Sequence, residues 1–171
     1  MVKKIAAGTG GGDCGGLNAA LEAITRSAAH EEWSVDIYKK GWEGFIFDDK
    51  VPLRLHDVEG IHSVTGTLAQ TSRTNPYNFT GELDGRFLEN ADVSGRVMEN
   101  IKKAGIEGVI ICGGDDTLSV IPRLIQNYGT SITFIGIPKT MDGDLQVYSL
   151  GLDTAINRAK QTLEDFIPIL K

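Results

Sequence analysis

The chain has 171 residues, which suffices for one well-buried core or for one domain with part of another. Its net charge of −6 comes from acidic and basic residues mixed along the sequence, so nothing recommends a nucleic-acid partner, and no apolar run approaches membrane-spanning length. Because Cys14 and Cys112 occur in a chain without a secretory signal, we expect a cytoplasmic protein with reduced thiols and no disulfide framework.

The first forty residues predict a strand, a helix and a second strand. Residues 4–7 are expected to form the first strand, which leads into a glycine-rich loop at residues 8–16. The helix that follows has apolar residues at helical spacing on one face: Leu17, Leu21, Ile24 and Ala28. Residues 35–38 then form the second strand.

The stretch from residue 41 to residue 85 is rich in turn residues and has weak periodicity. It predicts short strands, a short helix near residues 58–63 and a mobile loop around residues 74–76. The next helix is marked by apolar residues at helical spacing: Val93, Val97 and Ile101. Gly105 is expected to stop this helix.

The last third of the chain continues the alternation. Residues 108–112 and 132–137 predict buried strands, because both runs are rich in β-branched residues. A helix after Thr117 separates them, and residues 152–167 predict a final amphipathic helix. The whole pattern favours an α/β fold with a mostly parallel sheet and helices on both faces.

Two segments rich in glycine and aspartate follow the two β-branched strands. They are Gly-Gly-Asp-Asp-Thr at residues 113–117 and Pro-Lys-Thr-Met-Asp-Gly-Asp at residues 138–144. The carboxyl ends of the strands in an open α/β sheet are where ligands bind, beside the amide-rich N-termini of the following helices. Carboxylates at such an edge would repel a phosphate unless a divalent metal lay between them. The sequence therefore predicts metal-dependent phosphoryl transfer.

Each of these motifs also has an ordinary structural explanation. A glycine-rich loop such as Gly10-Gly11-Gly12 is often only a tight turn, Asp115 or Asp116 could cap the following helix, and residues 138–144 could form a polar turn. Two adjacent acids exceed what a cap requires, and a second acidic loop follows the neighbouring strand. Taken together, the motifs favour a phosphate ligand.

Four separated motifs together resemble the 6-phosphofructokinase family. Two are the segments at residues 113–117 and 138–144, and the others are Gly-Gly-Gly-Asp-Cys-Gly-Gly-Leu-Asn-Ala-Ala at residues 10–20 and Thr-Ser-Arg-Thr-Asn-Pro at residues 71–76. The resemblance implies a Rossmann-like N-terminal domain and a glycolytic enzyme that phosphorylates the C1 hydroxyl of fructose 6-phosphate. It covers only the N-terminal half of such an enzyme, whose sugar-phosphate ligands would lie beyond Lys171.

The resemblance also implies roles for individual residues. Asp142 would be the general base that takes the proton from the C1 hydroxyl, and Thr140 would hold the sugar. Asp115 and Asp144 would form the Mg²⁺ site. The remaining phosphate-binding positions that match the family are Gly11, Gly12, Arg73, Gly114, Asp116 and Lys139.

Asp116 is the position that the resemblance links to the choice of phosphoryl donor. ATP-using members usually have glycine there, whereas an aspartate repels the α-phosphate of a nucleotide and is typical of pyrophosphate users. Pyrophosphate is therefore the favoured donor, with an ATP-dependent enzyme as the alternative. Trp42 falls where ATP-using members place an aromatic residue beside the nucleotide, but here we expect it to pack in the core or at its edge.

Gly15 and Gly143 depart from the family pattern, which commonly has proline and asparagine at these positions. We expect Gly15 to loosen its turn without removing the backbone amides, and Gly143 to add freedom between the two flanking acids.

Residues 1–145 are expected to form the donor- and magnesium-binding domain, and residues 146–171 a helix that leads into a second domain absent from this chain. We therefore expect the chain alone to be inactive, and the protein to form a homo-oligomer or to need a complementary C-terminal half. Two other readings stay open. One is a non-catalytic module that binds a phosphate ligand, and the other is a kinase such as NAD kinase, which shares a Gly-Gly-Asp motif but has no reason to carry the segments at 71–76 and 138–144.

Overall fold

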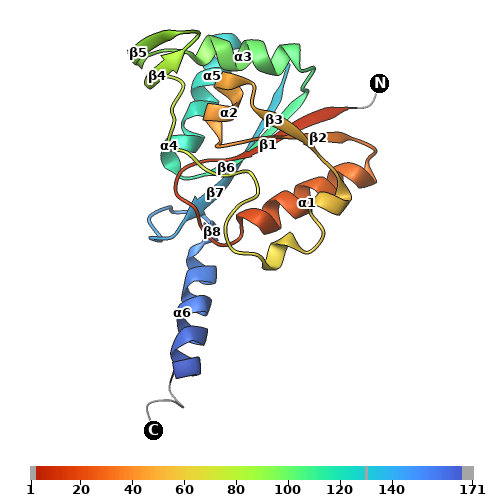
Figure 1. Ribbon diagram of the computed structural model, residues 1–171, viewed down its shortest axis with the longest axis vertical. Coiled ribbons are helices and arrows are strands. Elements are labelled where there is room, and N and C mark those ends of the chain that lie inside the picture. Colours follow the sequence, from red (N-terminus) through yellow and green to blue (C-terminus); the bar gives the residue numbers. More distant parts are fainter. Residues whose placement is uncertain (1–2, 130, 167–171) are drawn as a thin grey trace.

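A six-stranded sheet forms the centre of the computed structural model, which describes residues 3–129 and 131–166 (Figure 1). The strand order is β3–β2–β1–β6–β7–β8, and every neighbouring pair is parallel except β2 and β3. The strands are β1 (Lys4–Thr9), β2 (Ser34–Tyr38), β3 (Lys50–Leu53), β6 (Gly108–Gly113), β7 (Thr133–Thr140) and β8 (Leu150–Gly151). The predicted α/β fold with a mostly parallel sheet is confirmed.

Helices cover both faces of this sheet, as the sequence predicted. One face packs against α1 (Leu17–His30), and the other against α2 (Trp42–Phe47), α3 (Ser94–Lys103) and α5 (Val120–Tyr128). The short helix α4 (Asp115–Leu118) directly follows β6, and α6 (Leu152–Phe166) directly follows β8. A separate antiparallel hairpin is formed by β4 (Phe79–Leu83) and β5 (Arg86–Ala91).

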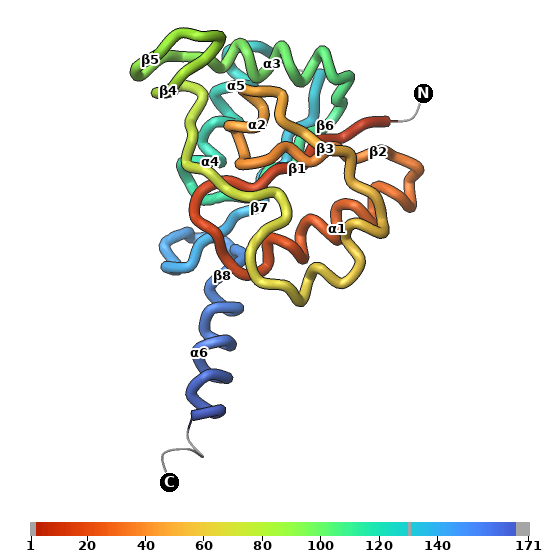
Figure 2. The backbone as a smooth tube through the Cα atoms, in the orientation of Figure 1, coloured from red at the N-terminus to blue at the C-terminus, as the bar shows by residue number. Residues whose placement is uncertain are grey.

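The segment between β3 and β4 contains only two 3₁₀ turns, η1 (Leu55–Asp57) and η2 (Ile61–Ser63). It is the yellow stretch in Figure 2, which runs beside α1 before it turns back toward the hairpin. The short helix predicted near residues 58–63 is therefore a single 3₁₀ turn. The helix α2 was not predicted from the sequence, because Gly41 and Gly44 interrupt the local pattern. The predicted end of β7 at residue 137 lies three residues before its end in the structure.

The final helix begins at Leu152 as predicted, while Ile167 lies outside the described residues. In Figure 1 this helix projects away from the sheet, and none of its described residues is buried. Beyond its first turn, its large apolar side chains are more than half exposed: Ile156 55%, Leu163 66% and Phe166 56%. Only its first turn packs closely on the body, where Thr154 fills the space that a Cβ atom at Gly15 would need. The apolar stripe predicted for packing thus has no covering element among the described residues.

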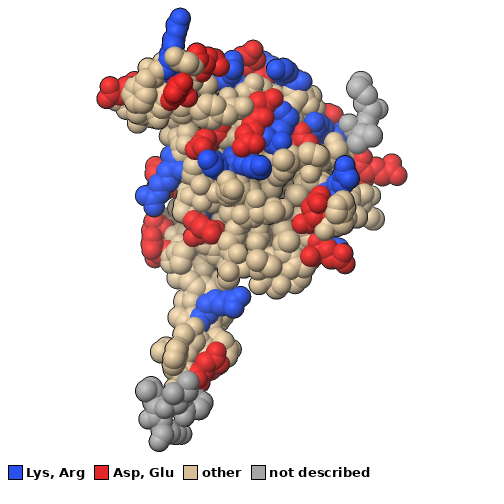
Figure 3. All heavy atoms as spheres, in the orientation of Figure 1, with Lys and Arg blue, Asp and Glu red and all other residues tan. Residues whose placement is uncertain are grey.

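Acidic and basic side chains are interspersed over the face shown in Figure 3, without a continuous basic patch on that face. Within the described part of the chain, no helix combines the length and the apolar character needed to cross a membrane.

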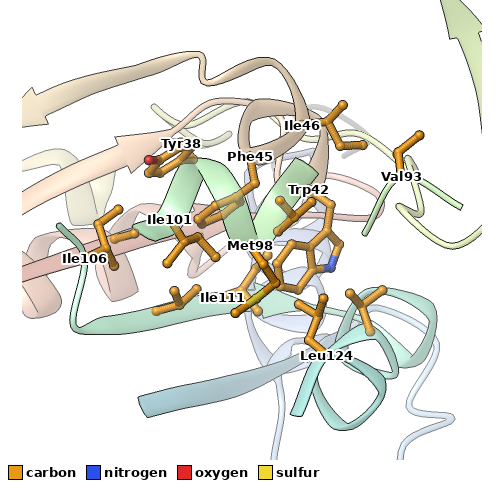
Figure 4. Close-up of a cluster of buried hydrophobic side chains, with 14 of the residues drawn as sticks. Tyr38, Trp42, Phe45, Ile46, Val93, Met98, Ile101, Ile106, Ile111 and Leu124 are labelled. Carbon is orange, nitrogen blue, oxygen red and sulfur yellow. The ribbon is translucent and has the colours of Figure 1, made fainter. Parts of the chain in front are cut away.

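The larger apolar cluster lies between the sheet and the helices α2, α3 and α5, and its buried side chains include Trp42, Phe45, Met98 and Leu124 (Figure 4). Trp42 is 1% exposed, which confirms the prediction that it packs in the core. A buried side-chain amide links α3 to α2. The Nδ2 atom of Asn100 on α3 donates to the carbonyl oxygens of Phe45 at 2.8 Å and Ile46 at 3.1 Å. Asn100 therefore satisfies the C-terminal carbonyls of α2, which have no helical partner of their own.

We predict that Asn100→Ala lowers the free energy of unfolding by about 1–3 kcal/mol, because it leaves buried carbonyls without a donor. The matched control is Asn157→Ala on α6, where the asparagine is exposed and makes no side-chain hydrogen bond within the described residues. The control should stay within about 0.5 kcal/mol of the unmodified protein. Equal effects of the two variants in denaturant titration would contradict this account of α2.

Candidate active site

A cavity of about 480 Å³ lies at the carboxyl ends of β1, β6 and β7. Four separate segments of the chain form its walls: the loop after β1, the residues around Arg73, the start of α4, and the end of β7 with the loop that follows. All ten residues proposed as site residues from the sequence line it: Gly11, Gly12, Arg73, Gly114, Asp115, Asp116, Lys139, Thr140, Asp142 and Asp144. The topology therefore brings the four motifs to one place.

The loop after β1 is held against the neighbouring segments by its backbone. The amide of Gly10 donates to the carbonyl of Cys112 at 2.8 Å, and the amide of Gly11 donates to the carbonyl of Ser72 at 2.7 Å. The side chain of Thr117 fits between two glycines, since a Cβ atom at Gly10 would lie 2.8 Å from its Cγ2 atom and one at Gly113 would lie 2.5 Å from it. Both positions require glycine because a side chain there would displace Thr117.

The segment before Arg73 is fixed to the same loop and to α1. The hydroxyl of Thr9 donates to the carbonyl of Gln70 at 2.7 Å, and the side chain of Asn18 accepts from the amide of Leu68 at 2.8 Å. The loop around residues 74–76, which the sequence predicted to be mobile, contacts α2 through the Thr74 hydroxyl, which donates to Glu43 at 3.0 Å, and its mobility stays a prediction. Arg73 itself is exposed at the cavity and makes no hydrogen bond or ion pair with the described residues, so its guanidinium is available to an anion.

Glu22 on α1 binds His62 near the beginning of the segment that leads to Arg73, and we call these contacts the Glu22 clamp. Its Oε2 atom accepts from the backbone amide of His62 at 3.0 Å and from the Nδ1 atom of the same residue at 2.8 Å, and its Oε1 atom accepts from the Nε atom of Arg26 at 2.9 Å. The hydrogen bond from the His62 ring is the main reason why the pKa of Glu22 falls to about 2. Glu22 therefore remains ionised well below the pH at which an ordinary glutamate gains a proton.

Lys139 is the buried cation of the site. It is 8% exposed, and it lies in β7 paired with Leu150 of β8. Its Nζ atom lies at the cavity wall beside Gly11, where a Cβ atom would come within 3.1 Å of it. Among the described residues it has no hydrogen-bond or ion-pair partner. The residue as a whole is buried, but its ammonium faces the cavity, where it is available to a ligand anion.

The acidic loop after β7 is ordered by Thr140, whose side chain is buried. Its hydroxyl donates to the carboxylate of Asp144 and accepts from the backbone amide of Asp142 at 3.1 Å. Between the two acids, Gly143 has a φ of +68°, a backbone conformation that glycine adopts freely and asparagine tolerates better than most residues. Both glycine and the asparagine of the family pattern are therefore compatible with this turn.

The cavity carries more negative than positive charge. Five carboxylates line it, from Asp13, Asp115, Asp116, Asp142 and Asp144, against the two cations Lys139 and Arg73. In the described residues, no group of three or more His, Cys, Asp or Glu side chains is arranged to hold a metal ion by itself. The donor set fits Mg²⁺, because proteins commonly bind this ion through one or two carboxylates and leave its other positions to water and phosphate oxygens.

The two thiols near the cavity are buried and take no part in its charge. Burial raises the pKa of Cys14, although the nearby Lys139 ammonium acts in the opposite direction, and burial raises the pKa of Cys112 to about 12. Both thiols therefore stay protonated at neutral pH.

Several wall residues were not singled out as ligands from the sequence, among them Thr74, Asn75, Met141 and Leu145. Thr74 and Asn75 belong to the motif that contains Arg73, so their adjacency was an available signal. Met141 and Leu145 lie within and directly after the motif at residues 138–144, so the same signal of adjacency was available for them.

The fold and the cavity define an α/β protein with a ligand site at the carboxyl edge of its sheet. A family model described as Phosphofructokinase matches residues 4–167. The chain therefore belongs to the phosphofructokinase family.

Relatives named for different phosphoryl donors match this chain at the same sequence identity. The chain is 38% identical over 165 residues to the pyrophosphate–fructose 6-phosphate 1-phosphotransferase of Streptomyces coelicolor, covering 94% of this chain and 44% of that protein. It is also 38% identical over 167 residues to the ATP-dependent 6-phosphofructokinase 2 of Clostridium perfringens, covering 95% of this chain and 45% of that protein. The chain thus spans less than half the length of these curated relatives.

Solved structures agree on the fold. Phosphofructokinase from Pichia pastoris in the T-state superposes with a TM-score of 0.76 and 26% identity, over 89% of this chain and 17% of that chain. The pyrophosphate-dependent phosphofructokinase of Marinobacter aquaeolei superposes with a TM-score of 0.67 over 85% of this chain and 35% of that chain, and at 18% identity it supports the fold alone.

The Glu22 clamp predicts a specific pH dependence of stability. Because the pKa of Glu22 is lowered in the folded protein, its stabilising contribution is complete above the pKa of about 4.5 that it has when unfolded, and it is lost as the pH falls toward 2. Glu22→Gln should therefore unfold at a lower temperature than the unmodified protein at pH 6. The difference should shrink between pH 5 and pH 3, and a difference that stays constant over this range would contradict the clamp.

Proposed function

We propose that the protein to which this chain belongs transfers a phosphoryl group from pyrophosphate to the C1 hydroxyl of fructose 6-phosphate, with Mg²⁺ at Asp115 and Asp144. The single observation that carries this proposal is the ammonium of Lys139, which has no partner among the described residues and faces a cavity where five carboxylates outnumber Lys139 and Arg73. That combination suits a polyanion that arrives together with a divalent cation. The family membership supplies the reaction type and the sugar substrate.

The residues of the cavity divide the chemistry between them. Asp142 accepts the proton of the C1 hydroxyl, and the hydrogen bond from its own amide to Thr140 holds the turn that presents it. Lys139 and Arg73 stabilise the negative charge on the transferred group, and Gly11 leaves room for it beside the Lys139 ammonium. Bound Mg²⁺ would neutralise charge between the phosphates and the two carboxylates.

Pyrophosphate is the favoured donor because of Asp116. Its carboxylate lines the cavity next to Asp115, and in the described chain it is exposed without a cationic partner. A carboxylate at this point repels a further phosphate that is not neutralised by metal, so it disfavours a nucleotide with its longer phosphate chain. The ATP-dependent relative from Clostridium perfringens keeps ATP as the second candidate.

We further propose that residues 1–145 form the donor- and magnesium-binding domain and that residues 146–171 lead into a second domain carrying the sugar-phosphate ligands. The relatives are more than twice as long as this chain, and α6 offers an exposed apolar stripe that a further domain could cover. A homo-oligomer or a complementary C-terminal half is part of this proposal. Residues 1–171 alone are then expected to bind pyrophosphate but not to turn it over.

The test of this proposal is a donor comparison in the full reading frame that encodes the chain. The unmodified protein should form fructose 1,6-bisphosphate with pyrophosphate and not with ATP. Asp116→Gly should raise kcat/KM for ATP by at least about tenfold, since it removes both the charge and the bulk that oppose a nucleotide. Asp116→Asn separates these causes, because it removes only the charge. Efficient ATP turnover by the unmodified protein would contradict the donor assignment.

A further inference from the structure

Trp42 makes a buried hydrogen bond to the acidic motif after β6. Its Nε1 atom donates to the carbonyl oxygen of Thr117 at 2.8 Å, across 75 positions of the chain. The indole is 1% exposed and packs on Phe45 with ring centroids 5.3 Å apart, so it does not reach the cavity. Figure 4 shows the ring within the apolar cluster, where its N–H group has to find a protein acceptor.

Thr117 links Trp42 to the two glycine-containing segments of the site at Gly10 and Gly113. It lies in α4, directly after Asp115 and Asp116, and its side chain fits between Gly10 and Gly113. A shift of Thr117 would therefore move the carboxylates of α4 relative to the loop that contains Gly11.

The neighbours of Trp42 hold the third wall of the cavity. Glu43 accepts from the hydroxyl of Thr74 at 3.0 Å through Oε2, and its Oε1 atom pairs with the ammonium of Lys40 at 3.2 Å. The carbonyl of Lys40 accepts from the hydroxyl of Ser72 at 2.8 Å. Ser72 and Thr74 flank Arg73, so these contacts fix the backbone on both sides of that arginine.

The backbone between these side chains also touches the first loop. A Cβ atom at Gly41 would lie 2.9 Å from the carbonyl oxygen of Thr9 and 3.0 Å from the Cα atom of Gly10. The segment from Lys40 to Glu43 thus contacts three of the four walls of the cavity, although none of its residues lines the cavity.

We propose that residues 40–43, which we call the α2 brace, position the donor site, and that Trp42 and Glu43 are positioning residues for pyrophosphate binding. The inference rests on the proposed donor. The brace sets the positions of Asp115, the loop at Gly10 and Arg73 relative to one another through contacts made outside the cavity. Small displacements of such groups cause large losses in binding and rate, because each must meet a different part of one anion.

The test replaces Trp42 by phenylalanine, which keeps an aromatic ring in the core but removes the N–H donor. Its matched control is Trp33→Phe, because Trp33 contacts Lys3 at the opposite end of β1 and lies far from the four walls. Pyrophosphate binding is measured by calorimetry with and without Mg²⁺, at a temperature where circular dichroism shows every variant to be folded. Trp42→Phe should weaken the Mg²⁺-dependent binding about tenfold, and Trp33→Phe should leave it unchanged.

Glu43 provides the conservative comparison. Glu43→Gln retains an oxygen that accepts from Thr74, whereas Glu43→Ala removes it. Affinity should therefore fall for Glu43→Ala and be largely restored in Glu43→Gln. A residue needed only for folding would lower the unfolding temperature in these variants without this pattern of affinities.

Hydrogen exchange separates the failure of the brace from the failure of the proposed donor. Without ligand, Trp42→Phe should speed exchange at the amides of residues 10–12 and 113–117, and Trp33→Phe should not. If the unmodified protein did not bind pyrophosphate but this exchange pattern appeared, the donor assignment would fail and the positioning role would stand. If Trp42→Phe bound pyrophosphate normally and exchanged normally, the α2 brace would be wrong.

Discussion

The site depends on an ammonium that faces the cavity and has no counter-ion among the described residues. Lys139 is held in β7 by strand pairing on both sides, with Pro138 opposite Gly113 of β6 and Thr140 opposite Gly151 of β8. The backbone from which its side chain extends is therefore set by the sheet and not by a flexible loop. The cavity thus offers a cation to an anionic ligand.

The carboxylates around Lys139 restrict which anion can enter. Asp115 lies at the start of α4 and Asp144 in the loop after β7, and the Thr140 hydroxyl orients Asp144 by donating to it. A bare phosphate would meet more negative than positive charge, whereas a magnesium complex would meet ligands for its metal as well as a cation for its phosphates. The charge of the cavity and the ligand preference of Mg²⁺ therefore favour a magnesium complex of a phosphate compound, which is also the class of ligand that the family membership suggests.

The sequence predicted the elements that are specified locally, and it missed those that distant contacts define. The apolar spacing from Leu17 to Ala28 gave α1, and the β-branched runs gave β6 and β7, so the acidic motifs were correctly expected to meet at one edge of the sheet. The helix α2 was missed because two glycines weaken its local pattern, and a hydrogen bond to Thr117, 75 positions away, anchors it. The end of β7 was missed because β8, its partner there, is only two residues long. Lys139 was expected at the site, but its burial follows from that pairing.

The most direct test of this account is to replace Lys139 by methionine, which has a similar length and no charge, and to use Lys102→Met on the exposed surface of α3 as the control. Pyrophosphate affinity in the presence of Mg²⁺ and thermal stability without ligand are then measured together. Lys139→Met is expected to lower the affinity at least about tenfold at a temperature where it is folded, because the cavity loses a cation that meets the phosphates, and Lys102→Met is expected to leave the affinity unchanged. Unchanged affinity of Lys139→Met, or an equal loss in both variants, would contradict the central role of Lys139.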